Sequence, residues 1–294
     1  RIRWRIPLFL GLYLIAIFVV AWVFNLVADP VEQWFSAPHV FLYVLGFAGS
    51  FLVYSFAVKP ATELQQAFRD KVLPTIFGFI GDVRYSRNTV PGSFDRLPRG
   101  VTGSFNRQSF DDVIAGRYED FSFELYEASL SRKSGKSTQT LFHGVVLAFE
   151  METAFPGVLV ATRRSAKVSR FFRDLFGSTD LEELTSGVAH LDEKYEFRSD
   201  NLAAARPLVT GRLARALDWL REGWPNEPAR VALQGHDGFL LLPDHKNFFE
   251  LPGVGTPLDY DVHIKPIIVD MVTLLATGAL VRKVGSRDDA STQA

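Results

Sequence analysis

Two uninterrupted apolar segments fill the first fifth of the chain. The first covers residues 6–28 and the second residues 35–58, and neither contains a Lys, Arg, Asp or Glu. A helix needs about 20 apolar residues to cross the hydrocarbon core of a bilayer, so each segment is long enough to span it. The pattern predicts a transmembrane helical hairpin over residues 1–59, with Asp29 and Glu32 in the loop between the spans.

Basic residues flank this hairpin on its outer sides. Arg1, Arg3 and Arg5 precede the first span, and Lys59 follows the second. Because basic flanks stay in the cytoplasm, we expect a multi-pass protein of the bacterial inner (plasma) membrane with both termini cytoplasmic. The alternative is a cleaved signal peptide, whose apolar core usually has about 7–15 residues. The first segment is longer, and the second span would still deliver the rest of the chain to the cytoplasm.

The region 60–284 changes from helical to strand periodicity along its length. Apolar residues recur every three to four positions over 61–80, which predicts a helix leaving the membrane. Residues 86–109 are rich in Gly, Ser, Pro and Arg, which predicts a long loop. Alternating apolar and polar positions then predict three strands of an antiparallel meander, near residues 121–125, 145–151 and 158–160.

The second half of this region mixes helices and strands without a regular βαβ repeat. The last two meander strands are separated by Pro156-Gly157, which predicts a turn. The further elements that we expect are helices at 166–176, 211–222 and 265–284, a strand at 194–198, and a hairpin at 231–242 that turns at 235–238. Strands interspersed with single helices indicate a cytoplasmic α+β domain over 60–284. Residues 285–294 are polar and aperiodic, which predicts a disordered tail.

The helix predicted at 265–284 has two possible environments. It is nearly all apolar but carries Asp270 near its centre. An Asp at the centre of a spanning helix costs about 2.5–3.5 kcal/mol on insertion scales. We therefore expect a buried helix that closes the domain core, with a third membrane crossing as the alternative.

Composition narrows the classes of partner and chemistry. The net charge is −1, so no bulk electrostatic argument points to nucleic acid. The chain has no Cys, which excludes disulfides, thiolate metal sites and a cysteine nucleophile. The 26 Phe and the hydrophobic content of 47% exceed the needs of two spans, so the cytoplasmic region should hold a core of its own.

Three groups of residues suggest chemistry, and each has a simpler structural explanation. Gly135-Lys136-Ser137 resembles the end of a phosphate-binding loop, but the preceding glycine of that motif is absent and a strand follows, so we predict a hairpin loop. Asp259, Asp261 and His263 alternate and would share one side of an extended segment, where they could bind a metal. We prefer a polar connector before the last helix, with Asp261 or His263 near its N-terminus, where an acid favours the helix dipole. His143 is expected as a hydrogen-bonded core residue. We predict no catalytic, cofactor or metal site.

A basic amphipathic segment is the sharper candidate. We expect a helix over residues 163–176 whose apolar face includes Val168, Phe172 and Leu175. Its basic face consists of Arg163, Arg164, Lys167, Arg170 and Arg173. Lys and Arg near an anionic membrane contribute about 1 kcal/mol each, so these residues could bind inner-leaflet lipids or an acidic partner. The alternative is a core helix with a solvated basic face.

Three segments resemble the DUF3137 family of bacterial membrane proteins of unknown function. They are residues 111–116 followed by Phe123-Glu124, residues 142–148, and residues 195–206 leading into the helix at 211–222. With the hairpin, the resemblance covers nearly the whole chain. It implies a two-span anchor with a cytoplasmic α+β domain, and it brings no established activity or site residue. The Arg-rich stretch at 84–107 departs from the family pattern.

These observations predict a tethered binding protein. We expect a non-enzymatic scaffold or an accessory subunit of an inner-membrane assembly, in contact with lipids and other membrane proteins or with a second copy. The alternatives are a membrane-surface enzyme with an unrecognised site and a sensor of anionic lipid acting through residues 163–176.

Overall fold

A computed structural model of the chain describes most of its length in two compact units. The units are Arg1–Leu73 with Leu251–Asp259, and Pro74–Glu250 with Tyr260–Ala294. The described residues are 5–27, 37–164, 181–224, 227–244, 248–249, 256 and 259–283. The predicted helix at 166–176 and the predicted tail at 285–294 lie outside them.

The first unit contains two helices that pack against each other. They are α1 (Arg5–Val27) and α2 (Ala37–Ile76), and α2 continues without a break into the first residues of the second unit. The second apolar segment and the helix predicted after it therefore form one element. The hydroxyl of Tyr13 donates to the carbonyl of Gly46 at 2.7 Å. A side chain at Gly49 would collide with the Tyr13 ring, so the close approach of the two helices depends on this glycine.

Apolar side chains cover the outside of this helix pair. Phe47 is 81% exposed and Phe51 is 71% exposed. Among the described residues, two helical windows are long and apolar enough to cross a membrane, Tyr43–Pro60 and Tyr260–Arg282, while Pro7–Val23 forms a shorter apolar helix. The first window is almost wholly exposed, whereas 44% of the second is buried.

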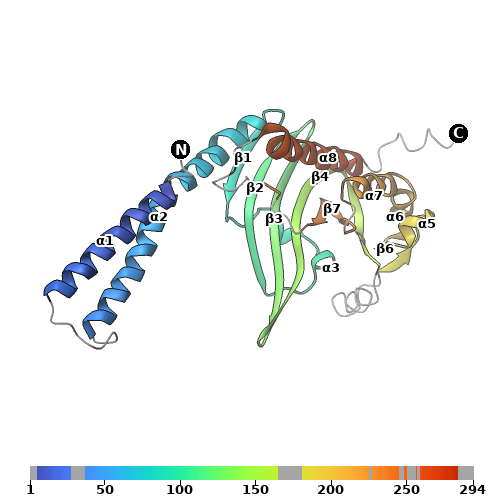
Figure 1. Ribbon diagram of the computed structural model, residues 1–294. Coiled ribbons are helices and arrows are strands. Elements are labelled where there is room, and N and C mark those ends of the chain that lie inside the picture. Colours follow the sequence, from blue (N-terminus) through green and yellow to red (C-terminus); the bar gives the residue numbers. More distant parts are fainter. Residues whose placement is uncertain are drawn as a thin grey trace. The chain divides into compact units, whose positions relative to one another are not determined.

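The second unit is built on a seven-stranded antiparallel sheet (Figure 1). The strand order is β1-β2-β3-β4-β6-β5, and β7 pairs with the other edge of β4. The strands are β1 (Gly81–Arg87), β2 (Arg107–Tyr118), β3 (Phe121–Ser134), β4 (Ser137–Arg163), β5 (Glu182–Leu184), β6 (Tyr195–Ser199) and β7 (Arg230–Pro243). This sheet and its helices confirm the predicted α+β class.

Two of the predicted turns are wrong because β4 and β7 are long, bent strands. The strands expected near 145–151 and 158–160 are both part of β4, and Pro156-Gly157 lies at a register shift within it. The hairpin expected at 231–242 is the single strand β7, whose residues 235–238 face the same irregular stretch of β4. Register shifts in the pairing of β4 with β7 bend both strands at the same place. The Gly residues there mark a bend within a strand and not a turn between two strands.

One face of the sheet is covered by the segment between β1 and β2. This segment, expected as a loop, contains the short helices η2 (Phe94–Arg96) and α3 (Arg99–Thr102). Phe94 packs edge-on against Phe110 with ring centroids 4.7 Å apart. The carboxylate of Glu124 holds the segment in place by accepting from the backbone N–H and the hydroxyl of Ser93, at 2.7 and 2.6 Å.

The opposite face is covered by helices. Leu125, Leu147 and Leu240 lie side by side on neighbouring strands and are fully buried beneath it. The helices of this unit are α5 (Ala189–Asp192), α6 (Leu202–Val209), α7 (Arg212–Gly223) and α8 (Lys265–Arg282), with the π-helical turn η3 (Tyr260–Ile264) before α8. Figure 1 shows α8 along one side of the sheet, and it contacts β4, β7 and α7. Helix α7, strand β6 and helix α8 confirm three sequence predictions.

Helix α8 is held closely to the sheet at its C-terminal end. A Cβ atom at Gly278 would lie 3.2 Å from Cδ2 of Leu147, so the small residue permits the contact. Arg282 is buried and donates to Asp120 at 2.7 Å, and its guanidinium lies 5.1 Å from the ring centroid of Phe121. These contacts agree with the expectation of a buried helix that closes the core of this unit.

Candidate functional site

A β-bulge brings three carboxylates together where β2 and β3 pair. Phe110 lies opposite Ala128 and Val113 opposite Tyr126, so Asp111 and Asp112 both face the single residue Glu127. Two residues opposite one is the definition of a bulge, and bulges redirect side chains locally. One carboxylate oxygen from each of the three acids lies within 4.8 Å of the others.

Side chains of β1 and one backbone amide hold these acids. Arg87 binds Asp111 through two hydrogen bonds, of 2.6 and 3.3 Å. The hydroxyl of Tyr85 donates to Asp112, whose side chain is fully buried. The backbone N–H of Phe249 donates to Glu127 at 3.0 Å. The cluster therefore connects three neighbouring strands with the segment after β7.

The pKa of Glu127 is shifted into the neutral range. Burial, with a smaller contribution from the negative charge of Asp112, raises the pKa of Glu127 to about 7. The N–H of Phe249 acts in the opposite direction because it stabilises the carboxylate. A carboxyl group with such a pKa can take up or release a proton at neutral pH.

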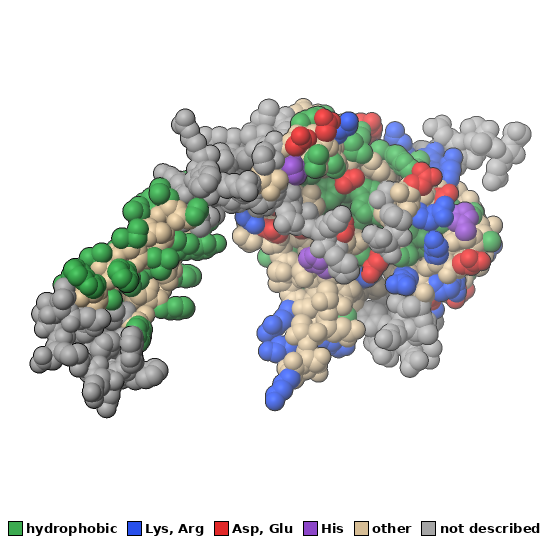
Figure 2. All heavy atoms as spheres, viewed as in Figure 1, with side chains coloured by type: hydrophobic (Ala, Val, Ile, Leu, Met, Phe, Trp, Pro, Cys, Tyr) green, Lys and Arg blue, Asp and Glu red, His purple; other side chains and the backbone are tan. Residues whose placement is uncertain are grey.

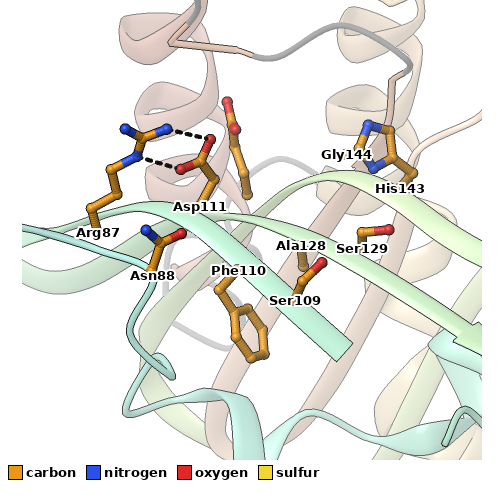
Figure 3. Close-up of a pocket in the computed structure, with 10 residues that line it drawn as sticks. Arg87, Asn88, Ser109, Phe110, Asp111, Ala128, Ser129, His143 and Gly144 are labelled. Carbon is orange, nitrogen blue, oxygen red and sulfur yellow. Dashed lines mark hydrogen bonds and ion pairs between the residues drawn. The ribbon is translucent and has the colours of Figure 1, made fainter. Parts of the chain in front are cut away.

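A polar hollow of about 340 Å³ extends from this cluster across the sheet. Ser109, Ser129 and His143 form a row on β2, β3 and β4, because Ser129 pairs with both of the others. Figure 3 shows Asp111 directed toward Arg87 and Phe110 on the opposite side of the sheet. The face of the sheet that is apolar beneath α8 therefore becomes polar at the hollow. His143 lines this hollow and is exposed, so the prediction that it is a core residue is wrong.

The cluster offers oxygen atoms of the kind that Mg²⁺ or Ca²⁺ prefers. At least one oxygen of each acid already accepts a hydrogen bond, from Arg87, Tyr85 or the amide of Phe249. A cation would have to displace or rearrange these donors. In the described geometry Arg87 and the hydroxyl of Tyr85 hold Asp111 and Asp112, and Glu127 is the titratable member of the cluster.

The predicted basic segment is divided by the structure. Arg163 is the last residue of β4 and Arg164 follows it, so the prediction of a helix beginning at 163 is wrong. The strand continues because Arg163 pairs with Tyr195 of β6. Lys167, Arg170 and Arg173 lie outside the described residues. Arg163 and Arg164 line a second hollow, of about 310 Å³, together with Lys194, Arg221 and Trp224.

The sequence did not predict which residues join Asp111 and Asp112 in the first hollow or Arg163 and Arg164 in the second. Consecutive acids at 111–112 were a visible signal, but their neighbour Glu127 depends on strand register, which local periodicity does not encode. Of the motifs that suggested chemistry, Gly135 and Lys136 form the two-residue connection between β3 and β4, as predicted for a hairpin loop. Asp261 and His263 lie in the turn η3 directly before α8, and Asp261 pairs with Lys265 at 3.4 Å, so the preferred interpretation as a polar connector near the N-terminus of that helix is confirmed.

Comparisons with known proteins show little similarity. No family model matches the chain, and no curated protein matches it. The crystal structure of the mycobacterial trehalose monomycolate transport factor A, TtfA, is similar over 72% of this chain and 94% of that chain. The sequence identity is 12% and the TM-score 0.41. The resemblance to the DUF3137 family remains a prediction from the residues.

Proposed function

We propose that the protein is a membrane-anchored scaffold or accessory subunit of the bacterial inner membrane. The helices α1 and α2 would form the anchor, and the unit that contains the sheet would lie in the cytoplasm. Its partners would be membrane lipids and other membrane proteins or a second copy of the chain.

The exposed apolar surface of α1 and α2 is the observation that carries this proposal. Phe18, Phe47 and Phe51 are each more than two-thirds exposed, and Trp22 and Tyr54 are at least half exposed. Soluble monomers rarely expose a contiguous apolar patch of more than a few hundred Å², so water is a poor solvent for this surface. A bilayer would cover it, and the basic flanks predicted for the hairpin favour a cytoplasmic second unit.

The hollows of the second unit support a binding role. Ligand pockets usually enclose about 300–1,000 Å³. The two hollows described above have volumes of about 340 and 310 Å³ and lie at the lower end of that range. Hollows of this size, lined by charged and hydroxyl side chains among others, suit contacts with a headgroup or with another protein.

Replacement of Phe47 and Phe51 by Asp tests the anchor. Each Asp at the centre of a spanning helix costs about 2.5–3.5 kcal/mol, so the double variant should be lost from the membrane pellet after alkaline carbonate extraction. The control carries two Asp residues at exposed positions of the second unit, Val90 and Gln139, and should stay in the pellet with the wild-type chain. Extraction of the wild-type chain itself into the supernatant would refute the anchor.

A membrane-surface enzyme is the second candidate function. The observation in its favour is Glu127, whose pKa of about 7 suits a general acid or base. An enzymatic function predicts that the protein converts a substrate and that Glu127→Gln abolishes this conversion without unfolding the protein.

A further inference from the structure

A second, cationic hollow forms where three parts of the sheet unit meet. Arg163 and Arg164 come from the end of β4, Lys194 from the turn between α5 and β6, and Arg221 and Trp224 from the end of α7. The pairing of Arg163 with Tyr195 brings the first two of these parts together. Because the lining residues are far apart in the sequence, the hollow exists only in the folded unit.

Cationic side chains outnumber carboxylates in the lining of this hollow. Its lining contains four cationic side chains and one carboxylate, that of Glu193. Burial lowers the pKa of Arg230, the charge of Glu227 raises it, and the charge of Arg163 lowers it, so Arg230 is a further cation within electrostatic range of Arg163. The Arg230 guanidinium donates to the carbonyls of Val101 and Leu141, at 2.9 and 3.3 Å.

Two of the cations are already fixed by the protein. Arg164 donates to Glu183 at 2.8 Å and to the carbonyl of Asp192 at 2.8 Å. Arg221 donates to Asp218 at 3.0 Å, and Asp218 also binds His190. These bonds hold both guanidinium groups as a rigid wall, which reduces the entropy lost when an anion binds.

The other two cations are available to a ligand. Arg163 and Lys194 are exposed, and neither forms an ion pair with any carboxylate in the described part of the chain. Within the same part, the buried Nε of Arg221 has no hydrogen-bond acceptor. The half-buried indole of Trp224 adds an aromatic surface and one N–H donor.

We propose that this hollow binds a phosphate group carried by a larger, partly apolar or planar molecule. Arg guanidinium groups match phosphate oxygens in pairs, Lys contributes a point charge, and the Trp224 ring would contact the attached body. The phosphate could belong to a phospholipid headgroup or to a soluble phosphate compound. The proposal goes beyond the membrane anchor and does not depend on it.

Isothermal titration of the full chain in neutral maltoside micelles tests the site. The probes are inorganic phosphate and dihexanoyl phosphatidylglycerol below its micellar concentration. Saturable binding of inorganic phosphate would indicate a soluble source, and saturable binding of the lipid alone would indicate a headgroup. Absence of binding by both probes would overturn the proposal.

The decisive comparison is between two double variants with equal charge change. Arg163→Gln with Lys194→Gln should weaken binding by about tenfold or more, since two charge-assisted contacts are lost. The control is Arg132→Gln with Lys136→Gln, on the projecting β3–β4 hairpin where Lys and Arg side chains also gather (Figure 2). It should bind as the wild type does, and equal weakening in both variants would show nonspecific charge attraction and refute the site. Lys194→Glu, a single change at an exposed position, replaces the first variant if that variant does not keep the wild-type melting temperature.

Discussion

Glu127 shows how the properties of one side chain depend on strand register. Its carboxyl group is acidic in the unfolded chain, where its pKa has the ordinary value of 4.5. In the folded unit the bulge places Asp111 and Asp112 opposite it, and burial removes most of its water. The folded protein thus favours the protonated form of Glu127, so its stability depends on pH.

Replacement of Glu127 by Gln should flatten the pH dependence of stability. Because the folded pKa is above the unfolded one, this group stabilises the fold fully below pH 4.5 and loses that contribution as pH rises through about 7. The loss is at most about 3.4 kcal/mol, since the pKa rises from 4.5 to about 7 and each pKa unit corresponds to about 1.36 kcal/mol. Thermal melting of the full chain in detergent at acidic and mildly alkaline pH measures it.

Exposed Glu152 provides the matched control for this measurement. Glu152→Gln should keep the wild-type difference in melting temperature between the two pH values, whereas Glu127→Gln should reduce it. An unchanged difference in Glu127→Gln would mean that the folded pKa of this group is not raised.

Among the elements, helix α8 was open to two interpretations from its sequence. Its apolar length suits a membrane span, and Asp270 and Arg282 suit a buried helix. In the structure it contacts β4, β7 and α7, and Gly278 permits its approach to Leu147. The environment of this element is therefore defined by the sheet that it covers.

Replacement of Gly278 by Leu should destabilise the sheet unit. The added Cβ would lie 3.2 Å from Leu147, and the larger side chain would force the helix away from the sheet. Overpacking of this kind costs about 1–3 kcal/mol, which would lower the melting temperature of a unit of this size by about 2–4 °C for each kcal/mol.

The control on the same helix is Val269→Leu, because Val269 is 53% exposed. A substitution at such a position should change stability by less than about 0.5 kcal/mol. If Gly278→Leu melted like this control, α8 would not pack on the sheet, and the third membrane crossing would gain support.

At the scale of the whole molecule, the orientation in the membrane can be measured directly. A protease-sensitive tag after residue 283 should be cleaved in inverted inner-membrane vesicles and protected in intact spheroplasts, because basic flanks keep both ends in the cytoplasm. A tag between the two predicted spans, within residues 29–34, should show the opposite pattern. Cleavage of the C-terminal tag in spheroplasts would contradict the proposed topology and the cytoplasmic location of the sheet unit.

The sequence by itself determined the elements whose burial follows a local pattern. The two apolar segments, α7, β6 and α8 could be predicted because each repeats its apolar positions at the period of its own backbone. β1 and β2 were missed, since Gly, Ser and Arg obscure the alternation over residues 81–118. The basic residues at 163–164 could be recognised as a binding candidate, but not their partners Lys194 and Arg221.

Only the tertiary structure decided how distant residues meet. β4 and β7 each continue as one strand because the register shifts of one lie opposite the irregular stretch of the other. Without the partner strand, Pro156-Gly157 and residues 235–238 have the sequence of turns. The acid cluster depends on a bulge in the pairing of β2 with β3, and the cationic hollow on the pairing of β4 with β6. Pairing register is a property of two strands together, and for that reason local periodicity cannot encode it.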